Sequence, residues 1–482
     1  MKSKKKSYDA IIIGGGIAGQ EAALNLASMN FNVLIVEKDL SIGGKMIQLS
    51  KVFPTLDCAA CITTPKMSET LRHPNITAIL YAEIESIGKT ENAFEVTISK
   101  KPRYVKEELC TGCQLCEYVC PQVLSDQYNY DMVGRKAIFI PFSLANPKVA
   151  VIDIDNCIHC HRCVKVCVSK AIDFKQQRQC ISVTAKSVIF ATGFRLISPE
   201  ARPELGYREF PNVIDSLQMD RLIAPTRPYN EIVRPGDGKV PDNIAYVLCV
   251  GSRDSSVSND RSSDPNMKNP ICSQICCMYS IKQAQLLTGA LPLVDITVYY
   301  MDIRAFGKGY EEFYNEAKGM GINFVKGKIA RINGADDNSG DLILRYEDVV
   351  KGVLKETRHD LVVLSAGIKP ESAIVNVFEN EKPELDEYGF IRQVDELLNP
   401  AATSIVGVFA AGMASGPKDI PDSILSAGCA ATAVASYLRK HAPVDFSEPE
   451  EEKTKDLVVS PGQTVPVQNE ESEPLHVYVN QE

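Results

Sequence analysis

The hydrophobic pattern of the first forty residues predicts a strand, a turn, a helix and a second strand. Residues 8–13 form a short apolar run that is typical of a buried parallel strand. A glycine-rich turn follows at residues 14–19, and apolar residues then recur at helical spacing as far as about Ser28. A second apolar run, residues 32–36, ends at Glu37. This order predicts a βαβ unit whose G-x-G-x-x-G turn cradles a dinucleotide pyrophosphate.

Each part of this unit has a physical role in such binding. Small glycines let the backbone approach a pyrophosphate at the helix N-terminus, and the carboxylate after the second strand accepts hydrogen bonds from ribose hydroxyls. A tight turn without a ligand is the alternative. The candidate cofactor-binding residues are Gly14, Gly16, Gly19, Glu37, Lys38, Gly44, Lys45, Thr192, Gly193 and Gly412.

Two later apolar runs belong to the same domain. Residues 188–193 (V-I-F-A-T-G) and 405–412 (I-V-G-V-F-A-A-G) predict buried strands, and a helix follows the second from about Asp422 to Leu438. Both resemble elements of two-dinucleotide-binding flavoproteins of the thioredoxin-reductase-like group. In that group the N-terminal unit binds FAD and the late strand returns to cover it. Met413 stands where the group usually has an acid, so the contact to the ribityl hydroxyls is open.

A cysteine-rich segment interrupts these flavin half-motifs. Within residues 105–181 the pattern C-x-x-C-x-x-C-x-x-x-C occurs twice, which is the two-cluster ferredoxin pattern. We expect two [4Fe–4S] clusters, because the fourth cysteine of each run ligates the other cluster. The first cluster is assigned to Cys110, Cys113, Cys116 and Cys167, and the second to Cys157, Cys160, Cys163 and Cys120. Structural zinc is the rival, but it does not explain the third and fourth cysteines of both copies. His159 and His161 are expected to tune solvent access rather than to ligate.

The predicted architecture is therefore an α/β, two-dinucleotide-binding, thioredoxin-reductase-like flavoprotein with an inserted two-cluster ferredoxin domain. The flavoprotein domain is discontinuous, at 1–104 and 182–444, with its second βαβ half at about 240–370. Residues 136–142, between the two cysteine runs, have a strand-like pattern.

Further cysteines lie outside the insert. Cys249 follows the apolar strand 244–248, and Cys272, Cys276 and Cys277 follow within thirty residues. Together they could supply four ligands to a third cluster, or some could be buried thiols. Cys58 and Cys61 form a C-x-x-C that could be a redox dithiol, part of a cluster site or a pair of buried structural thiols. A redox dithiol needs a nearby base or helix N-terminus, which the sequence does not display. Cys180 and Cys429 are expected to be packed thiols.

Composition and charge limit the function classes. Of 482 residues, 45% are hydrophobic and 23% charged, which excludes a collagen-like or coiled-coil chain. The net charge is −9, and residues 445–482, with ten acids and two bases, account for −8 of it. No basic nucleic-acid-binding surface is therefore expected. We predict that residues 445–482 form a disordered or loosely attached tail.

The 16 cysteines bear on the compartment. Most stand in tight C-x-x-C runs, which favour metal ligation in a reducing compartment over secreted disulfides. No apolar run reaches the roughly 18 residues of a membrane helix. The basic start precedes only a strand-length apolar run, unlike a signal peptide. The cytoplasm is the expected location.

Several longer strings closely resemble the A subunit of heterodisulfide reductase. They are residues 57–67 (D-C-A-A-C-I-T-T-P-K-M), 101–104 (K-P-R-Y), 242–254, 272–284 and 301–314. Their order and the insertion point of the ferredoxin also resemble that family, over about residues 7–440. Relative to the long methanogen form, an N-terminal extension and a C-terminal ferredoxin domain are missing.

The resemblance implies a flavin-based electron-transfer subunit that works with other subunits of such a complex, with a homodimer also open. Some family members split electron pairs between acceptors of different potential. The resemblance also favours the third cluster, because the C-x-x-x-C-C string matches a cluster site of the family. Lys282, on an expected helix at 278–287, is either a surface lysine or a residue that approaches flavin N5 and stabilises a reduced anion.

The competing hypothesis is a self-sufficient NAD(P)H-linked FAD and iron–sulfur oxidoreductase that resembles the small subunit of glutamate synthase. Such an enzyme needs a second G-x-G-x-x-G turn after the strand 244–248. The turn here reads C-V-G-S-R-D, with one glycine and a candidate cluster ligand. Direct oxidation of NAD(P)H is therefore disfavoured.

Overall fold

The computed structural model describes residues 6–254, 269–440, 465–467 and 475–477. The chain divides into two compact units, Met1–Lys440 and His441–Glu482. None of the helices among the described residues combines the length and the hydrophobicity that a bilayer-spanning segment requires.

The first sheet of the larger unit is built on the predicted βαβ unit. Its strands run in the order β3 (Ile76–Leu80), β2 (Val33–Glu37), β1 (Lys6–Ile13), β10 (Gln179–Phe190), β5 (Phe94–Lys100) and β4 (Ala82–Lys89), and β20 (Val408–Ala410) pairs with the end of β10. The first four are parallel, and β5 and β4 continue as an antiparallel pair. β20 is shorter than the predicted strand at 405–412, because Gly407 has a φ of 87° and breaks the extended run.

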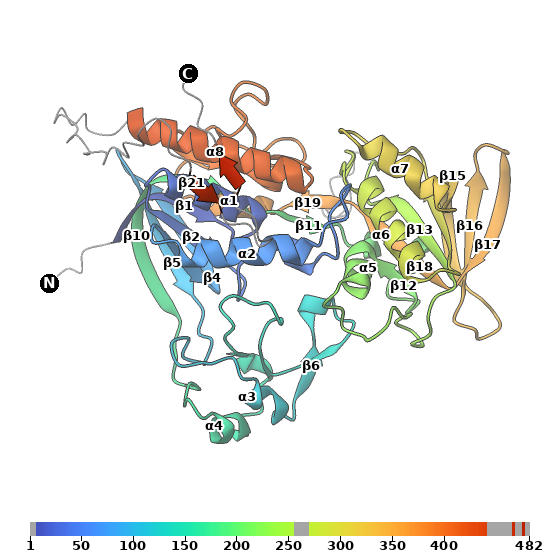
Figure 1. The fold of residues 1–482 in the computed structure, drawn as a ribbon, viewed down its shortest axis with the longest axis horizontal. Helices are drawn as coiled ribbons and strands as arrows, with labels where there is room; N and C mark the ends of the chain where they lie inside the picture. The colour runs from blue at the N-terminus through green and yellow to red at the C-terminus, as the bar shows by residue number, and fades with distance from the viewer. Residues whose placement is uncertain (1–5, 255–268, 441–464, 468–474, 478–482) are drawn as a thin grey trace. The chain divides into compact units, whose positions relative to one another are not determined.

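Helices cover the first sheet as the apolar periodicity requires. Figure 1 shows α1 (Ile17–Ser28) beside α8 (Ile420–Lys440), and the two share one apolar core with β1 and β2. The other face holds a second core that includes Ile11, Leu34, Phe94 and Phe190. α2 (Ala59–Arg72) lies against α1 and β3.

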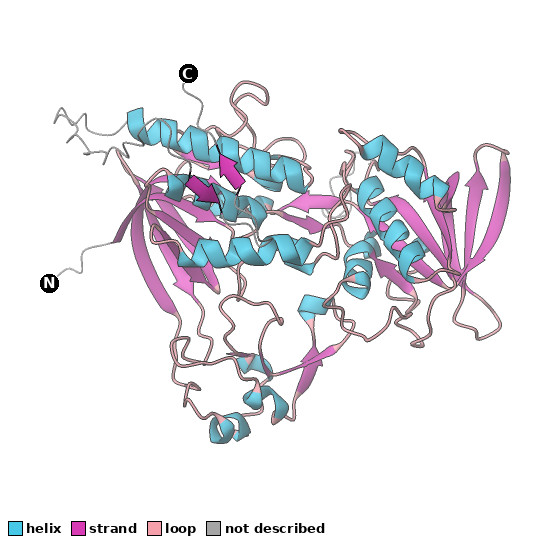
Figure 2. Cartoon of the chain, viewed as in Figure 1, coloured by secondary structure: helices cyan, strands magenta, loops and turns pink. Residues whose placement is uncertain are grey.

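The second sheet repeats the parallel strand order of the first. Its order is β12 (Val213–Asp215), β18 (Leu361–Ala366), β13 (Asn243–Val250), β14 (Asp295–Tyr300), β15 (Asn323–Gly334), β16 (Leu342–Asp348) and β17 (Val353–His359). The run β15-β14-β13-β18 corresponds to β3-β2-β1-β10, and β15, β16 and β17 form an antiparallel meander. Its apolar core includes residues of α5 (Ser216–Ile223), α6 (Cys276–Ala290) and α7 (Tyr310–Gly319), the helices beside this sheet in Figure 2. Because β12 belongs to this sheet, the second half begins earlier in the chain than the predicted 240.

The cysteine-rich segment leaves and re-enters the first sheet at one point. Lys100 at the end of β5 pairs with Gln179 at the start of β10, so the excursion occupies residues 101–178, close to the predicted 105–181. It contains two short helices, and the predicted strand at 136–142 is replaced by short pieces. These elements are α3 (Leu115–Tyr118), β6 (Val123–Ser125), β7 (Gly134–Lys136), β8 (Ile138–Phe139), β9 (Val151–Ile152) and α4 (Arg162–Val166).

The smaller unit is described only in two places. β21 (Val465–Val467) and β22 (Leu475–Val477) pair as antiparallel strands. The prediction for 445–482 is a disordered or loosely attached tail, and these two short strands do not test it. The rest of that prediction lies outside the described residues.

Candidate functional site

A large cavity lies where the first sheet, the inserted segment and helices α5 and α6 meet. Its volume is about 1250 Å³, above the roughly 300–1,000 Å³ of most small-molecule sites. The turn after β1 lines one side of it, with Gly14 and Gly16. Residues 126–128 and Tyr130 of the insert line a second side, and Ile275, Tyr279 and Lys282 of the α6 region line a third. The size fits an extended cofactor such as a dinucleotide.

The glycine turn after β1 is shaped by close backbone contacts. Gly14 has a φ of +109°, and a Cβ there would lie 2.3 Å from the Ala191 carbonyl oxygen. A Cβ on Gly19 would lie 1.9 Å from the Gly14 oxygen. At Gly16, in contrast, the nearest atom to such a Cβ is the Gly44 Cα at 3.9 Å. Gly14 and Gly19 therefore close the turn, while Gly16 leaves space beside the N-terminus of α1 for an anion.

Glu37 connects the end of β2 to this turn. One carboxylate oxygen accepts the Gly15 N–H at 2.5 Å, and the other accepts the Asp39 N–H at 2.9 Å. The pKa of Glu37 is raised to about 7, first by burial and then by the nearby Asp39 charge, against the lowering effect of the two N–H groups. The side chain lines the cavity, where a ribose hydroxyl could donate to it.

The other predicted cofactor-binding residues divide into two groups. Those that line the cavity are Lys38, Gly44, Lys45, Thr192 and Gly193, and Met413 lines it too. Gly19 and Gly412 do not line it. Gly412 has a φ of 60°, and a Cβ there would lie 2.8 Å from that of Ala18, so this glycine serves the packing of the turn. Burial lowers the pKa of Lys45, whose Nζ lies 5.7 Å from the Phe194 ring centroid.

Lys282 is buried, so the alternative of a surface lysine is wrong. Only 1% of the residue is exposed, and its Nζ lies 2.6 Å from Asp220 Oδ1 and 3.3 Å from Ser50 Oγ. Asp220 also accepts hydrogen bonds from the Ser50 N–H and the Gln283 amide. A buried ammonium requires such a partner, because desolvation of an unpaired charge is costly. The pair holds the lysine at the cavity wall.

The turn after β13 brings four thiols together. Cys249 is the next-to-last residue of β13 and has a φ of 61°, Cys272 lies in the loop before α6, and Cys276 and Cys277 begin α6. Burial raises the pKa of Cys276 well above its usual range, and Cys249, Cys277 and Cys272 add to the increase. Burial also raises the pKa of Cys277 to about 12. The predicted grouping of these cysteines is therefore present in the fold, whereas their ligation of a cluster stays a prediction.

The charges around this cysteine group favour the binding of an anionic ligand. The N-terminus of α6 points its partial positive charge at Cys276 and Cys277. Arg253 lies beside Cys249 and pairs with Asp302, with Nη2 3.0 Å from Oδ2. The helix is longer than predicted, because the apolar periodicity of 278–287 extends back through the buried cysteines.

Both cysteine runs of the insert have the same backbone shape. In the first run Gly112 and Gln114 have φ values of 66° and 65°, and in the second His159 and His161 have 50° and 54°. These four residues occupy equivalent positions, and Gln114 and His161 precede α3 and α4. Successive turns into left-handed backbone expose N–H groups in a concave nest, a feature of many iron–sulfur sites. The repeat seen in the sequence is thus a repeat of structure.

The insert cysteines form part of its apolar core. Burial raises the pKa of Cys116 to about 12 and that of Cys163 to about 11. In Cys167 burial is outweighed by hydrogen bonds from Ser169 and the Ala171 N–H, which lower its pKa. Within the described residues, no three His, Cys, Asp or Glu side chains are arranged to hold a metal ion. The two inserted clusters accordingly remain predictions. His159 and His161 contact the Phe174 ring.

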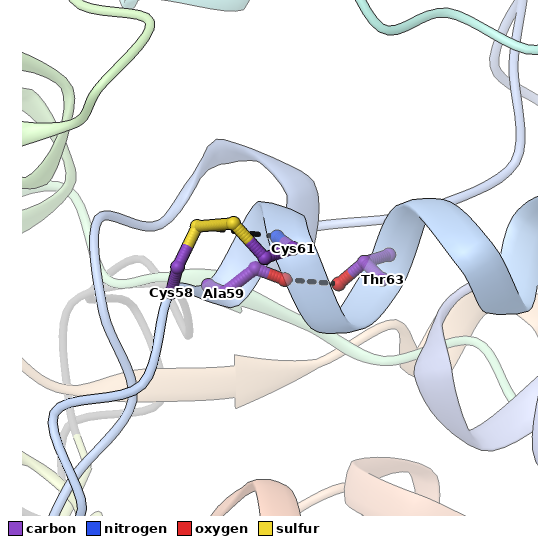
Figure 3. The surroundings of a disulfide bond; sticks show 4 residues. All are labelled: Cys58, Ala59, Cys61 and Thr63. Atoms are coloured by element: carbon purple, nitrogen blue, oxygen red, sulfur yellow. Dashed lines mark hydrogen bonds between the residues drawn. A yellow bond between two sulfur atoms is a disulfide. The ribbon is translucent and has the colours of Figure 1, made fainter. Parts of the chain in front are cut away.

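Cys58 and Cys61 are joined in a disulfide (Figure 3). Cys58 is the N-cap of α2, so the helix N-terminus that the sequence does not display is present. Among the three alternatives, the structure favours the redox pair over cluster ligands, since disulfide sulfurs carry no thiolate for a metal. Buried structural thiols are also disfavoured, because Cys61 is exposed.

Cys180 and Cys429 differ from their prediction as packed thiols. Both are exposed. Cys180 lies near the start of β10 where the sheet face is open, and Cys429 lies on the outer face of α8.

Sequence reasoning missed the insert's own contribution to the cavity. Tyr128 and Phe142 stack with centroids 4.6 Å apart, and the Tyr130 hydroxyl donates to Gln48 Oε1 at 2.8 Å. Asp220 and Ser50 were missed as well. The residue spacing gives no signal for these contacts, which join segments far apart in the chain.

Comparisons with known proteins support the fold. The family model "Glucose inhibited division protein A" matches residues 9–107, which include the glycine turn. The thioredoxin reductase of T. acidophilum superposes with a TM-score of 0.51 at 15% identity, covering 91% of this chain and 100% of that one. The predicted thioredoxin-reductase-like, two-dinucleotide-binding fold is therefore confirmed.

Two curated relatives match about nine tenths of this chain. The iron–sulfur A subunit of the CoB–CoM heterodisulfide reductase of Methanocaldococcus jannaschii is 42% identical over 427 residues, which are 88% of this chain and 63% of that protein. The A subunit of the H2:CoB–CoM heterodisulfide,ferredoxin reductase of Methanothermobacter marburgensis is 40% identical over 439 residues, 90% of this chain and 65% of that protein. The chain thus spans less than two thirds of the length of either relative.

Proposed function

Because the chain belongs to the family of heterodisulfide reductase A subunits, we propose that it is a flavin- and iron–sulfur-containing electron-transfer subunit of a heterodisulfide-reductase-like complex. Its cofactors would be FAD, two [4Fe–4S] clusters in the insert and a third at Cys249, Cys272, Cys276 and Cys277. Its partners would be the other subunits of such a complex.

One observation carries this proposal. A single cavity is lined by the glycine turn, by the insert and by helix α6. Ile275, which lines it, directly precedes Cys276 of the cysteine group. Tyr128 and Tyr130, which also line it, belong to the segment between the two cysteine runs of the insert. A cofactor in this cavity would thus have cysteine-bearing segments on two sides.

The residues fit FAD at the end of the cavity near β1. Gly16 leaves room for the pyrophosphate, and Glu37 faces the place of a ribose. Bound FAD would convert two-electron transfer into one-electron transfers, which iron–sulfur clusters alone do not do. Lys45 and Lys282 place cationic side chains along the cavity, and Asp220 orients the second of them. We infer that Lys282 tunes the flavin by favouring negative charge on it.

The cysteine groups fit iron–sulfur clusters in their chemistry. Soft thiolates are the preferred ligands of such clusters. The paired nests of the insert and the helix N-terminus at Cys276 each offer partial positive charge to an anionic cluster. Two cysteine-bearing sides would also give electrons two exits from the cavity, as electron bifurcation requires.

The alternative, a self-sufficient NAD(P)H-linked oxidoreductase, has less support. Its nicotinamide nucleotide would need an open glycine turn after β13. At that turn a Cβ on Gly251 would lie 2.7 Å from the Ile197 side chain, so the space beside it is filled.

Anaerobic purification with flavin and iron analysis tests the proposal. We expect about one FAD and about twelve irons per chain, since each [4Fe–4S] cluster contributes four. Fewer than about eight irons would remove the two inserted clusters. Absence of FAD would contradict the proposal that this chain is a flavin-containing subunit. An anaerobic pull-down with the tagged full chain should recover redox subunits as partners.

A further inference from the structure

The Cys58–Cys61 disulfide is not used by the proposed electron transfer between FAD and the clusters. We propose that this pair is a thiol–disulfide exchange centre, in which an external thiolate attacks Cys61 and Cys58 leaves. The centre does not depend on flavin or on clusters, so it stands or falls independently of the proposed function.

Accessibility selects Cys61 as the sulfur under attack. Cys61 is exposed, whereas Cys58 is half-buried and packs beside the apolar cluster of Ile42, Ile47 and Met67. Figure 3 shows Cys58 in the loop that enters the helix and Cys61 in its first turn. Exchange requires that the incoming thiolate reach one sulfur along the line of the sulfur–sulfur bond. Cys61 is the more exposed residue of the pair, so an incoming thiolate reaches it more readily than Cys58.

The helix N-terminus makes Cys58 the better leaving group. Cys58 is the N-cap of the 14-residue helix α2, and its Sγ accepts the Cys61 N–H at 3.2 Å. A thiolate released there would keep this hydrogen bond and would face the positive end of the helix dipole. No acidic residue lies in the first turn to oppose it. Departure of the more stabilised thiolate is faster.

The helix does not need the disulfide to keep its first turn. The Ile62 N–H donates to the Cys58 carbonyl at 3.2 Å, and the Thr63 hydroxyl donates to the Ala59 carbonyl at 2.7 Å, as Figure 3 shows for the second bond. The Ala59 N–H donates to the Ser50 carbonyl at 3.3 Å. These contacts hold the loop and the helix start in either redox state, so the pair can cycle without unfolding.

The chemistry balances as two exchange steps. In the first, the thiolate forms a bond to Cys61 Sγ, the bond between the two cysteines breaks, and Cys58 takes the electron pair as a thiolate. In the second, another external thiolate attacks the external sulfur of the mixed disulfide and releases Cys61. Two external thiols are oxidised to one disulfide, and the protein pair gains two electrons and two protons to become a dithiol.

A redox titration of the intact chain tests the proposal. The full-length protein is equilibrated anaerobically with mixtures of reduced and oxidised glutathione, quenched in acid, alkylated and digested with trypsin. The tryptic peptide of residues 52–66 contains these two cysteines and no others. We expect it to change from an internal disulfide to a doubly alkylated peptide in one two-electron step, with glutathione trapped at Cys61 in quenched intermediates.

Two variants assign the roles of the sulfurs, and Cys429→Ser is the matched control because it removes an exposed, unpaired cysteine. In Cys58→Ser, a glutathione adduct should accumulate on Cys61, since no neighbour resolves it. In Cys61→Ser, Cys58 should form its adduct about tenfold more slowly, because exposure limits thiol reactivity. The control should leave the titration unchanged, and circular dichroism checks the fold of each variant.

Three results would overturn the proposal. An internal disulfide that persists at every glutathione ratio would mean a structural crosslink. A peptide that is doubly alkylated at every ratio would mean that the pair does not cycle. Loss of iron from Cys58→Ser but not from Cys429→Ser would mean that the pair ligates a cluster.

Discussion

The turns after β1 and β13 stand at equivalent places in two sheets with the same parallel strand order. After β1, a glycine with a φ of +109° lets the chain pass against the Ala191 carbonyl, and Gly16 remains open. In the second sheet Cys249, the next-to-last residue of β13, takes the left-handed backbone instead, with a φ of 61°. The space beside Gly251 is filled by Ile197, and three further thiols gather at the start of α6.

The difference shows how one fold supports two kinds of site. A strand, a turn and a helix N-terminus offer partial positive charge in both sheets. Glycines at the turn let a phosphate come close to the backbone, whereas cysteines direct thiolates into the same region. The helix N-terminus suits either anion, and the side chains of the turn decide between them. Substitutions at the two turns should therefore have different consequences, and the largest is expected at the first.

The strongest test replaces the glycine at the first turn. Gly14→Ala places a Cβ 2.3 Å from a backbone oxygen at positive φ, so the free energy of unfolding should fall by about 2–4 kcal/mol. FAD should be lost from the purified protein. Flavin absorbance and thermal unfolding measure both effects.

Gly251→Ala in the second turn is the matched control. Its Cβ would lie 2.7 Å from Ile197 Cγ2 at a φ of +69°, but it would meet no backbone atom, so about 1–2 kcal/mol should be lost and FAD retained. Equal FAD loss in both variants would show that the two turns do not differ in cofactor binding.

The second test removes thiolates from the turn after β13. Cys276→Ser and Cys277→Ser should each lose about four irons, because serine offers a hard, protonated oxygen where iron prefers a soft thiolate. FAD and the inserted clusters should remain. Iron analysis and electron paramagnetic resonance measure the loss, with Cys429→Ser as the control. Unchanged iron and spectra in both variants would mean packed thiols and no third cluster.

The third test uses the pH dependence of FAD binding. Burial raises the pKa of Glu37 to about 7, and a ribose hydroxyl donates best to its ionised form. Lowering the pH through about 7 should therefore weaken FAD affinity, by about tenfold in total for one weakened charged hydrogen bond, as measured by titration of the apoprotein. Glu37→Gln should remove the dependence over this range. If the FAD affinity of the unmodified protein does not depend on pH, Glu37 does not bind the ribose.

The raised pKa of Glu37 should also make the apoprotein less stable as the pH rises. The folded-state pKa is raised from 4.5, so the contribution to stability is fully present below pH 4.5 and is lost as pH rises through about 7. Urea unfolding of the apoprotein at several pH values should show this decline. Glu37→Gln should reduce it.

The smallest expected effect concerns nicotinamide nucleotides. With the space beside Gly251 filled and no glycine cradle after β13, neither NADH nor NADPH should reduce the flavin on mixing. Stopped-flow absorbance under anaerobic conditions measures this directly. Rapid bleaching of the flavin would favour the self-sufficient oxidoreductase and would remove the contrast between the two turns.

The sequence by itself determined the parts whose signal is local. The run of residues 8–37 specified β1, the glycine turn, α1 and β2, because apolar periodicity and positive-φ glycines act within a few residues. The two cysteine runs of the insert likewise specified two copies of one backbone shape, since the spacing of the thiols constrains the turns between them.

Only the tertiary structure decided which distant polar groups meet. Lys282 is separated by 62 residues from Asp220 and by 232 from Ser50, and nothing in its local sequence distinguishes a buried ammonium from a surface one. Cys58 is an N-cap because α2 begins at Ala59, which the sequence pattern did not predict. The insert lines the cavity because of long-range contacts such as the hydrogen bond from Tyr130 to Gln48. The physical reason is that periodicity reports burial along one element, whereas charge pairing in a core depends on which elements the fold brings together.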